Sequence, residues 1–109
     1  MNKQWHTENP ISCPILATLN VIGGKWKPII LHMLSSGTMR FGVLKKNIPP
    51  VSQKMLTQQL RELEADGIIS RKVYAEVPPK VEYSLTDRGV TLKPILERLY
   101  AWGQENSSD

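Results

Sequence analysis

Cysteine is almost missing from this chain, which has only Cys13. A lone cysteine excludes an internal disulfide framework and a cysteine-rich zinc site. Long apolar runs are missing too, whereas a membrane-spanning helix needs about 18 apolar residues in a row. Because residues 1–10 also lack the apolar stretch of a secretory signal peptide, we expect a cytoplasmic protein without a membrane span.

Acidic residues are scarce in the middle of the chain. Residues 25–80 hold ten lysines and arginines against four aspartates and glutamates, a net charge of +6. Residues 81–109 carry a net charge of −2. A basic middle beside a slightly acidic tail favours a polyanionic partner for the middle only, although a solvated charged surface would have the same composition.

The length of 109 residues suits one domain with one modest core. The predicted helix at about 87–103 contains Pro94, which should kink it. Apolar spacing indicates that Ile29 and Val43, on two other predicted helices, face the core. Helices are predicted at about 14–22, 26–34, 42–47, 53–66 and 87–103, and strands at about 39–41, 69–77 and 80–85. These elements predict a fold that is mainly α with a small β-hairpin wing (α+β), a single winged helix-turn-helix domain over residues 1–109.

The predicted helix after Ser52 has two unlike faces. Leucines recur at helical spacing on one face and should pack inward. The other face carries long polar side chains of the kind that pair with base edges in the DNA major groove, glutamine with adenine and arginine with guanine. An ordinary exposed helix face would carry similar residues, so this face alone does not decide the function. The predicted base contacts are Gln53, Thr57, Gln58 and Arg61.

A basic hairpin with a Pro78-Pro79 tip follows this helix directly. A helix in the major groove next to a ribbon along the backbone is the arrangement of a winged helix-turn-helix bound to DNA. The alternative is an edge hairpin that its charges protect from aggregation. The predicted phosphate contacts are Ser52, Lys54, Arg40, Arg71, Lys72 and Lys80.

Signs of catalysis are weak. The run Gly23-Gly24-Lys25 lacks the spacing of a phosphate-binding loop, and Trp26 stands where that loop needs serine or threonine. His6 and His32 have no neighbours at metal-ligand spacing. We therefore expect no enzyme activity, no cofactor and no metal.

Five stretches carry a resemblance to a known family: Cys13-Pro14, LNVIGGKWKPIIL (19–31), Arg40-Phe41, SQKMLTQQLRELEADGII (52–69) and YAEVPPKVEYSLTDRG (74–89). With them the chain resembles the HxlR-type transcriptional regulators, a winged-helix family related in architecture to the MarR regulators. The resemblance extends over nearly the whole chain. It implies a homodimer that binds an inverted-repeat, palindromic operator in double-stranded DNA. A winged-helix module that binds a protein partner through the same helix is the alternative.

The resemblance also implies that the first and last helices, about 14–22 and 87–103, form the dimer interface. A physical reason points the same way, because a chain this short must bury the apolar stripe of its last helix somewhere. Packing of that stripe on the chain's own core is the alternative. The predicted interface residues are Trp5, Leu92, Ile95, Leu96, Leu99 and Trp102.

Cys13 directly precedes the first predicted helix. The partial positive charge at a helix N-terminus favours the thiolate form. Some regulators of the resembled family use a matching cysteine to sense oxidants, quinones or other electrophiles, and the resemblance therefore implies a redox-sensing role for Cys13. The alternative is a small apolar residue that senses nothing.

Overall fold

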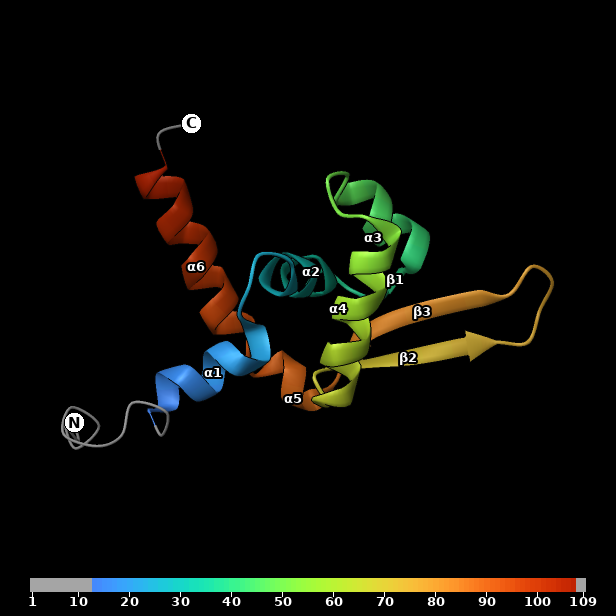
Figure 1. The fold of residues 1–109 in the computed structure, drawn as a ribbon, viewed down its shortest axis with the longest axis horizontal. Coiled ribbons are helices and arrows are strands. Elements are labelled where there is room, and N and C mark those ends of the chain that lie inside the picture. The colour runs from blue at the N-terminus through green and yellow to red at the C-terminus, as the bar shows by residue number, and fades with distance from the viewer. Residues whose placement is uncertain (1–12, 108–109) are drawn as a thin grey trace.

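The computed structural model describes residues 13–107, which form six helices and one three-stranded antiparallel sheet (Figure 1). Four helices precede the β2–β3 hairpin and two follow it, so the predicted fold class, a mainly α winged helix-turn-helix, is confirmed. In chain order the elements are α1 (Pro14–Ile22), α2 (Trp26–Leu34), β1 (Met39–Arg40), α3 (Phe41–Asn47), α4 (Gln53–Ala65), β2 (Ile69–Tyr74), β3 (Lys80–Leu85), α5 (Asp87–Val90) and α6 (Lys93–Asn106).

The core forms where α2, α3, α4 and the base of the sheet meet. Leu56, Leu60 and Leu63 from α4 are fully buried, as their spacing predicts. They join Ile30 and Leu31 of α2 in one hydrophobic cluster. Because one face of α4 is fixed in this core, its opposite face is held toward the surface.

Both ends of α4 are fixed by local hydrogen bonds. The Ser52 hydroxyl accepts from the Met55 backbone N–H at 3.0 Å and so caps the first turn. At the other end Gly67 takes a φ of +73°, which glycine adopts without steric cost. The N–H groups of Gly67 and Ile68 then reach back to the carbonyls of Glu64 and Leu63, each at 3.0 Å. This turn redirects the chain into β2.

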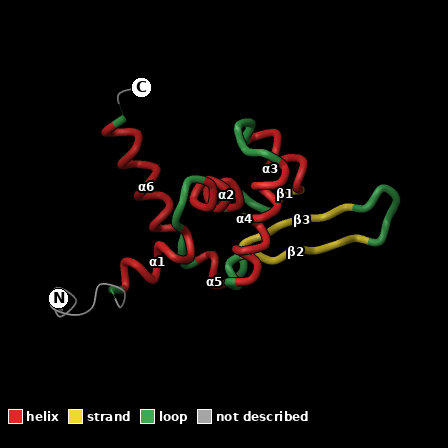
Figure 2. The backbone as a smooth tube through the Cα atoms, in the orientation of Figure 1, coloured by secondary structure: helices red, strands yellow, loops and turns green. Residues whose placement is uncertain are grey.

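The sheet has the strand order β1-β3-β2, and its β2–β3 hairpin extends from the body as the wing (Figure 2). Register pairs Arg71 with Tyr83 on one face, and Lys72 with Glu82 on the other. Tyr83 is buried, so its face is the inner one. The β1 strand adds Arg40 opposite Glu82 on the outer face.

Several details differ from the sequence predictions. Ile29 and Val43 are exposed, and Leu31 takes the inward position on α2 instead. The predicted last helix is two helices, α5 and α6, and Pro94 lies in the first turn of α6, where proline needs no N–H partner and causes no kink. The first wing strand ends at Tyr74 instead of residue 77.

Candidate nucleic-acid interface

The face of α4 predicted to contact bases is open. Gln53, Gln58 and Arg61 are exposed and Thr57 is half-buried. Together with Lys54 and Glu62 they line a shallow depression along the helix. The structure therefore brings the four predicted base-reading residues together on one accessible helix face, with Lys54 beside them.

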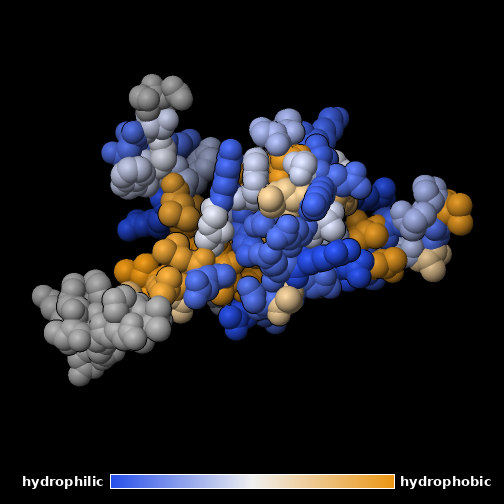
Figure 3. All heavy atoms as spheres, viewed as in Figure 1, coloured by the Kyte–Doolittle hydropathy of each residue, from blue (hydrophilic) through white to orange (hydrophobic). Residues whose placement is uncertain are grey.

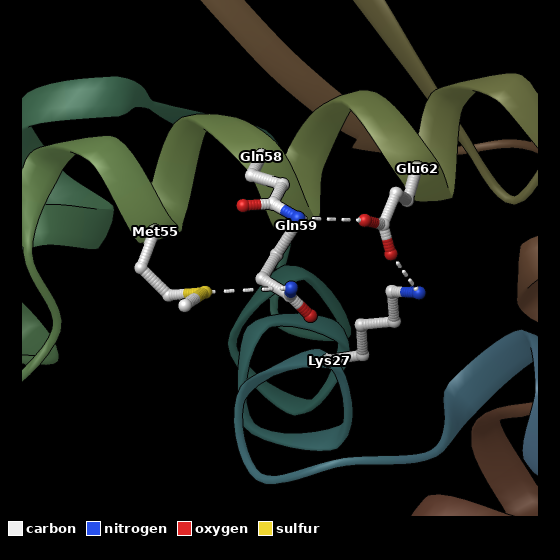
Figure 4. Close-up of polar contacts among 5 residues, drawn as sticks. All are labelled: Lys27, Met55, Gln58, Gln59 and Glu62. Atoms are coloured by element: carbon white, nitrogen blue, oxygen red, sulfur yellow. Dashed lines mark hydrogen bonds and ion pairs between the residues drawn. The ribbon is translucent and has the colours of Figure 1, made fainter.

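A buried lysine lies behind this face. Lys27 of α2 is only 8% exposed, and its Nζ lies 2.6 Å from Oε1 of Glu62 on α4. The other carboxylate oxygen of Glu62 accepts a hydrogen bond from Nε2 of Gln58 at 3.3 Å (Figure 4). These contacts, first Lys27 and then Gln58, lower the pKa of the Glu62 carboxyl below its ordinary 4.5.

The sequence predictions did not include the pairing of Lys27 with Glu62 at this site. Gln58 and Glu62 lie four residues apart on one helix, so their contact could have been anticipated from spacing. Lys27 lies on another helix, and nothing in the sequence except its charge indicated a contact with Glu62.

Acid should weaken this contact between α2 and α4. A carboxyl whose pKa is lowered by folding contributes stability above its unfolded pKa, and loses that contribution as the pH falls through the folded value. We expect the melting temperature of the wild type to fall more steeply below pH 4.5 than that of Glu62→Gln. Thermal melts across this pH range measure how steeply the melting temperature falls in each protein. Equal slopes would contradict the role of the Glu62 carboxylate in stabilising the α2–α4 contact. Some acid dependence should remain in the variant, because Glu82 also has a lowered pKa.

Arg71 lies on the inner face of the wing, next to α4. Its Nε is 3.7 Å from a Glu64 carboxylate oxygen. Arg71 and Tyr83 also line a small cavity of about 150 Å³ with Thr57 and Arg61 of α4. Arg71 therefore continues the open polar face of α4 onto the wing.

The remaining wing cations lie on the outer face around Tyr74. The Tyr74 hydroxyl donates to Glu82 Oε1 at 2.9 Å, and this bond is the main cause of the lowered Glu82 pKa. Lys72 and Lys80 place their ammonium groups 4.9 Å and 4.4 Å from the Tyr74 ring centroid. Lys80 is also 3.6 Å from Glu82, so part of its charge is already neutralised within the wing.

The six predicted phosphate contacts are thus spread over three places. Ser52 and Lys54 are exposed at the start of α4, where the Ser52 hydroxyl serves as the helix cap. Arg71 lies on the inner face of the sheet, and Arg40, Lys72 and Lys80 share the outer face. A DNA backbone that contacted all six residues would have to pass around both faces of the wing.

An exposed apolar surface lies on the side of the molecule formed by α1 and α6 (Figure 3). Its side chains include Ile15 and Leu19 of α1, and Ile95, Leu99 and Trp102 of α6. Among the residues predicted for a dimer interface, Leu96 is instead buried in the core of its own chain and Leu92 packs against that core. Trp5 lies outside the residues that the structure describes.

Cys13 occupies the N-cap position of α1 and is half-buried. Its backbone carbonyl accepts from the N–H groups of Leu16 and Ala17, and its thiol is free of any disulfide. The thiol therefore lies at the start of the helix, where the sequence placed it, next to the exposed apolar surface of α1.

Metal-ligating side chains do not gather anywhere within residues 13–107, and no helix in that range has the length and apolarity needed to cross a membrane.

Comparison with known proteins identifies the family. The model of the HxlR-like helix-turn-helix family matches residues 21–109. The HTH-type transcriptional regulator YtcD of Bacillus subtilis is 61% identical over 87 residues, which are 80% of this chain and 69% of the relative. The regulator YybR of the same organism is 53% identical over 98 residues, 90% of this chain and 78% of the relative.

Comparison with solved structures points to the same family. The redox regulator HypR in its oxidised form superposes with a TM-score of 0.86 at 52% identity, covering 89% of this chain and all of that one. HypR in its reduced form superposes with a TM-score of 0.85, covering 88% of this chain and 95% of that one. The chain belongs to the HxlR-like helix-turn-helix family of DNA-binding transcription regulators.

Proposed function

We propose that this regulator binds a palindromic operator in double-stranded DNA as a homodimer, with α4 in the major groove and the wing along the backbone. The observation that carries the proposal is the open polar face of α4, held outward by a fully buried leucine face. A helix with that exposed face fits a groove about 12 Å wide. Gln53, Thr57, Gln58 and Arg61 contact bases in this proposal.

The exposed apolar surface of α1 and α6 supports the dimer. Ile15, Leu19, Leu99 and Trp102 are each more than half exposed, and pairing them with a second copy would remove that surface from water. The whole chain then acts as one DNA-binding domain whose terminal helices form the interface. A two-fold dimer places its two copies of α4 in successive major grooves, about 34 Å apart.

Selection of bound sequences from random duplexes tests operator and dimer together. We expect an inverted repeat whose half-sites lie about one helical turn, roughly 10 base pairs, apart. Sedimentation of the free protein and of its complex gives the stoichiometry. A single unrepeated half-site together with a monomer in sedimentation would overturn the proposal, and binding without steep salt dependence would favour the protein-partner module instead.

Lys72→Ala tests the wing. Lys72 is exposed on the outer face, so its ammonium group can reach a phosphate. Each phosphate contact contributes about 0.9 to the slope of log affinity against log salt, so a dimer that loses two contacts should show a slope shallower by about 2. The base preference should not change. Lys93→Ala on α6 is the matched control, and equal slopes for both variants would remove Lys72 from the phosphate contacts.

We propose further that Cys13 makes DNA binding sensitive to oxidants or electrophiles. Its place beside α1 in the proposed interface supports this, as does the similarity to a redox regulator solved in two oxidation states. Two Cys13 thiols from two subunits would form a disulfide by giving two electrons and two protons to the oxidant, whereas an electrophile would form an adduct on one sulfur.

The test compares wild type with Cys13→Ser before and after diamide, whose N=N bond accepts the two electrons and two protons. We expect diamide to change the operator affinity of the wild type severalfold and to leave Cys13→Ser unchanged. Non-reducing gels show whether a cross-linked dimer accompanies the change. The same response in both proteins would exclude Cys13 as the sensor, since it is the only cysteine.

A further inference from the structure

We propose that Lys27 and Glu62 are positioning residues for base recognition: they hold the Gln58 amide with its oxygen toward the DNA, so that Gln58 selects a base that presents a hydrogen-bond donor. This inference rests on the proposed placement of α4 in the major groove. The Lys27–Glu62 ion pair, which lies behind the open polar face of α4, thereby acquires a role in base specificity.

The orientation of Gln58 follows from the chemistry of its partner. A carboxylate can only accept hydrogen bonds, so the Gln58 atom that faces Glu62 must be the amide nitrogen. The amide oxygen is left on the other side, pointing away from Glu62 (Figure 4). A free glutamine side chain would exchange its oxygen and nitrogen by rotation of the amide group, and the contact with Glu62 opposes that rotation.

Lys27 makes this arrangement compatible with DNA. Glu62 stands at the edge of the depression along α4, with its side chain 44% exposed, and an unpaired carboxylate there would repel phosphates. The Lys27 ammonium group, 2.6 Å away, neutralises that charge from the protein side. Because Lys27 is nearly buried, it does so without itself facing the groove, and it fixes the carboxylate that fixes Gln58.

With its nitrogen held toward Glu62, the Gln58 amide offers a free oxygen as acceptor, which restricts the bases that Gln58 can read. In the major groove adenine presents a donor at N6 and cytosine at N4, whereas guanine and thymine present only acceptors. The second amide hydrogen of Gln58 remains free, and adenine alone offers it an acceptor, N7, beside the N6 donor. We therefore assign adenine as the preferred base opposite Gln58, with cytosine second.

Selection from random duplexes measures this for wild type, Gln58→Ala and Glu62→Ala. Gln58→Ala identifies the position that Gln58 reads. At that position Glu62→Ala should reduce the preference for adenine over guanine or thymine about tenfold, while binding to non-specific duplex stays equal or becomes tighter because a negative charge is lost. A purely structural role would instead weaken all binding together.

Three further variants complete the design. Glu64→Ala removes an equal charge from the same helix. Glu64 contacts Arg71 and not Gln58, so the preference for adenine at the Gln58 position should stay. Lys27→Arg should keep the preference and Lys27→Met should reduce it. If Lys27→Met does not fold, Glu62→Ala decides, since Glu62 is partly exposed. Because this variant leaves the nearly buried Lys27 ammonium group without its partner, circular dichroism checks that it keeps its helices.

The outcomes separate this inference from the function on which it rests. An unchanged preference in Glu62→Ala, with sequence-specific binding by the wild type, overturns the positioning role alone. A guanine or thymine preference at the Gln58 position overturns it as well. A wild type that selects no sequence at all overturns both the positioning role and the proposed function.

Discussion

Thr57→Glu should lower operator affinity about a thousandfold without changing the fold. Thr57 lies in the middle of the α4 face, one helical turn from Gln53 and one from Arg61. A glutamate there brings a negative charge against the DNA and can also pair with Arg61 and withdraw it from the bases. At about 2 kcal/mol for each half-site, a dimer on a palindrome loses about 4 kcal/mol, which is close to three factors of ten.

Fluorescence anisotropy with the selected operator measures this loss, and circular dichroism checks that Thr57→Glu keeps its helices and its melting temperature. Gln104→Glu is the control, because it adds the same charge on α6, away from α4, and should change affinity by less than about threefold at physiological salt. Sedimentation checks that this variant, whose helix lies in the proposed interface, still forms the dimer. If Thr57→Glu bound the operator as well as Gln104→Glu does, α4 would not lie in the groove and the proposed function would fail.

The elements that carry the site could be predicted because their signals are local. The leucines of α4 recur at helical spacing, so its buried and open faces follow from the sequence alone. Ser52 before that helix and Gly67 after it fix both ends through bonds to neighbouring residues. The alternation of Val81, Tyr83 and Leu85 likewise identifies the second wing strand.

What the sequence could not supply depends on contacts between distant segments. The ion pair of Lys27 with Glu62 exists because α2 crosses behind α4, and neither residue type predicts a partner across that distance. Arg71 and Lys72 lie on opposite faces of any strand, but only the register, which pairs Arg71 with the buried Tyr83, shows that Arg71 is on the inner face. Leu96 shows the same limit, because an apolar stripe on a helix does not reveal which of its residues meet the chain's own core.

Gly89→Ala should destabilise the fold by about 3 kcal/mol, the upper end of the cost of overpacking a core. Gly89 is buried in α5, and a Cβ atom there would collide with the backbone carbonyl oxygen of Ile68. That carbonyl cannot easily move, since it accepts from both the backbone N–H and the hydroxyl of Thr86 at 3.0 Å. The Thr86 hydroxyl also accepts from the Gly89 N–H at 3.1 Å, so the three residues are held together.

Gly42→Ala is the same chemical change, but we expect it to raise the stability of the fold instead of lowering it. Gly42 lies in α3, is exposed, and has open space where its Cβ would be. Alanine there should stabilise the protein by about 0.5 kcal/mol, because glycine is a poor helix former. Urea unfolding at one fixed protein concentration compares the two variants, since subunit association would make stability depend on concentration. A Gly89→Ala protein as stable as the wild type would mean that α5 can move away from Ile68, and that the wing and α6 are joined less rigidly than the bonds of Thr86 imply.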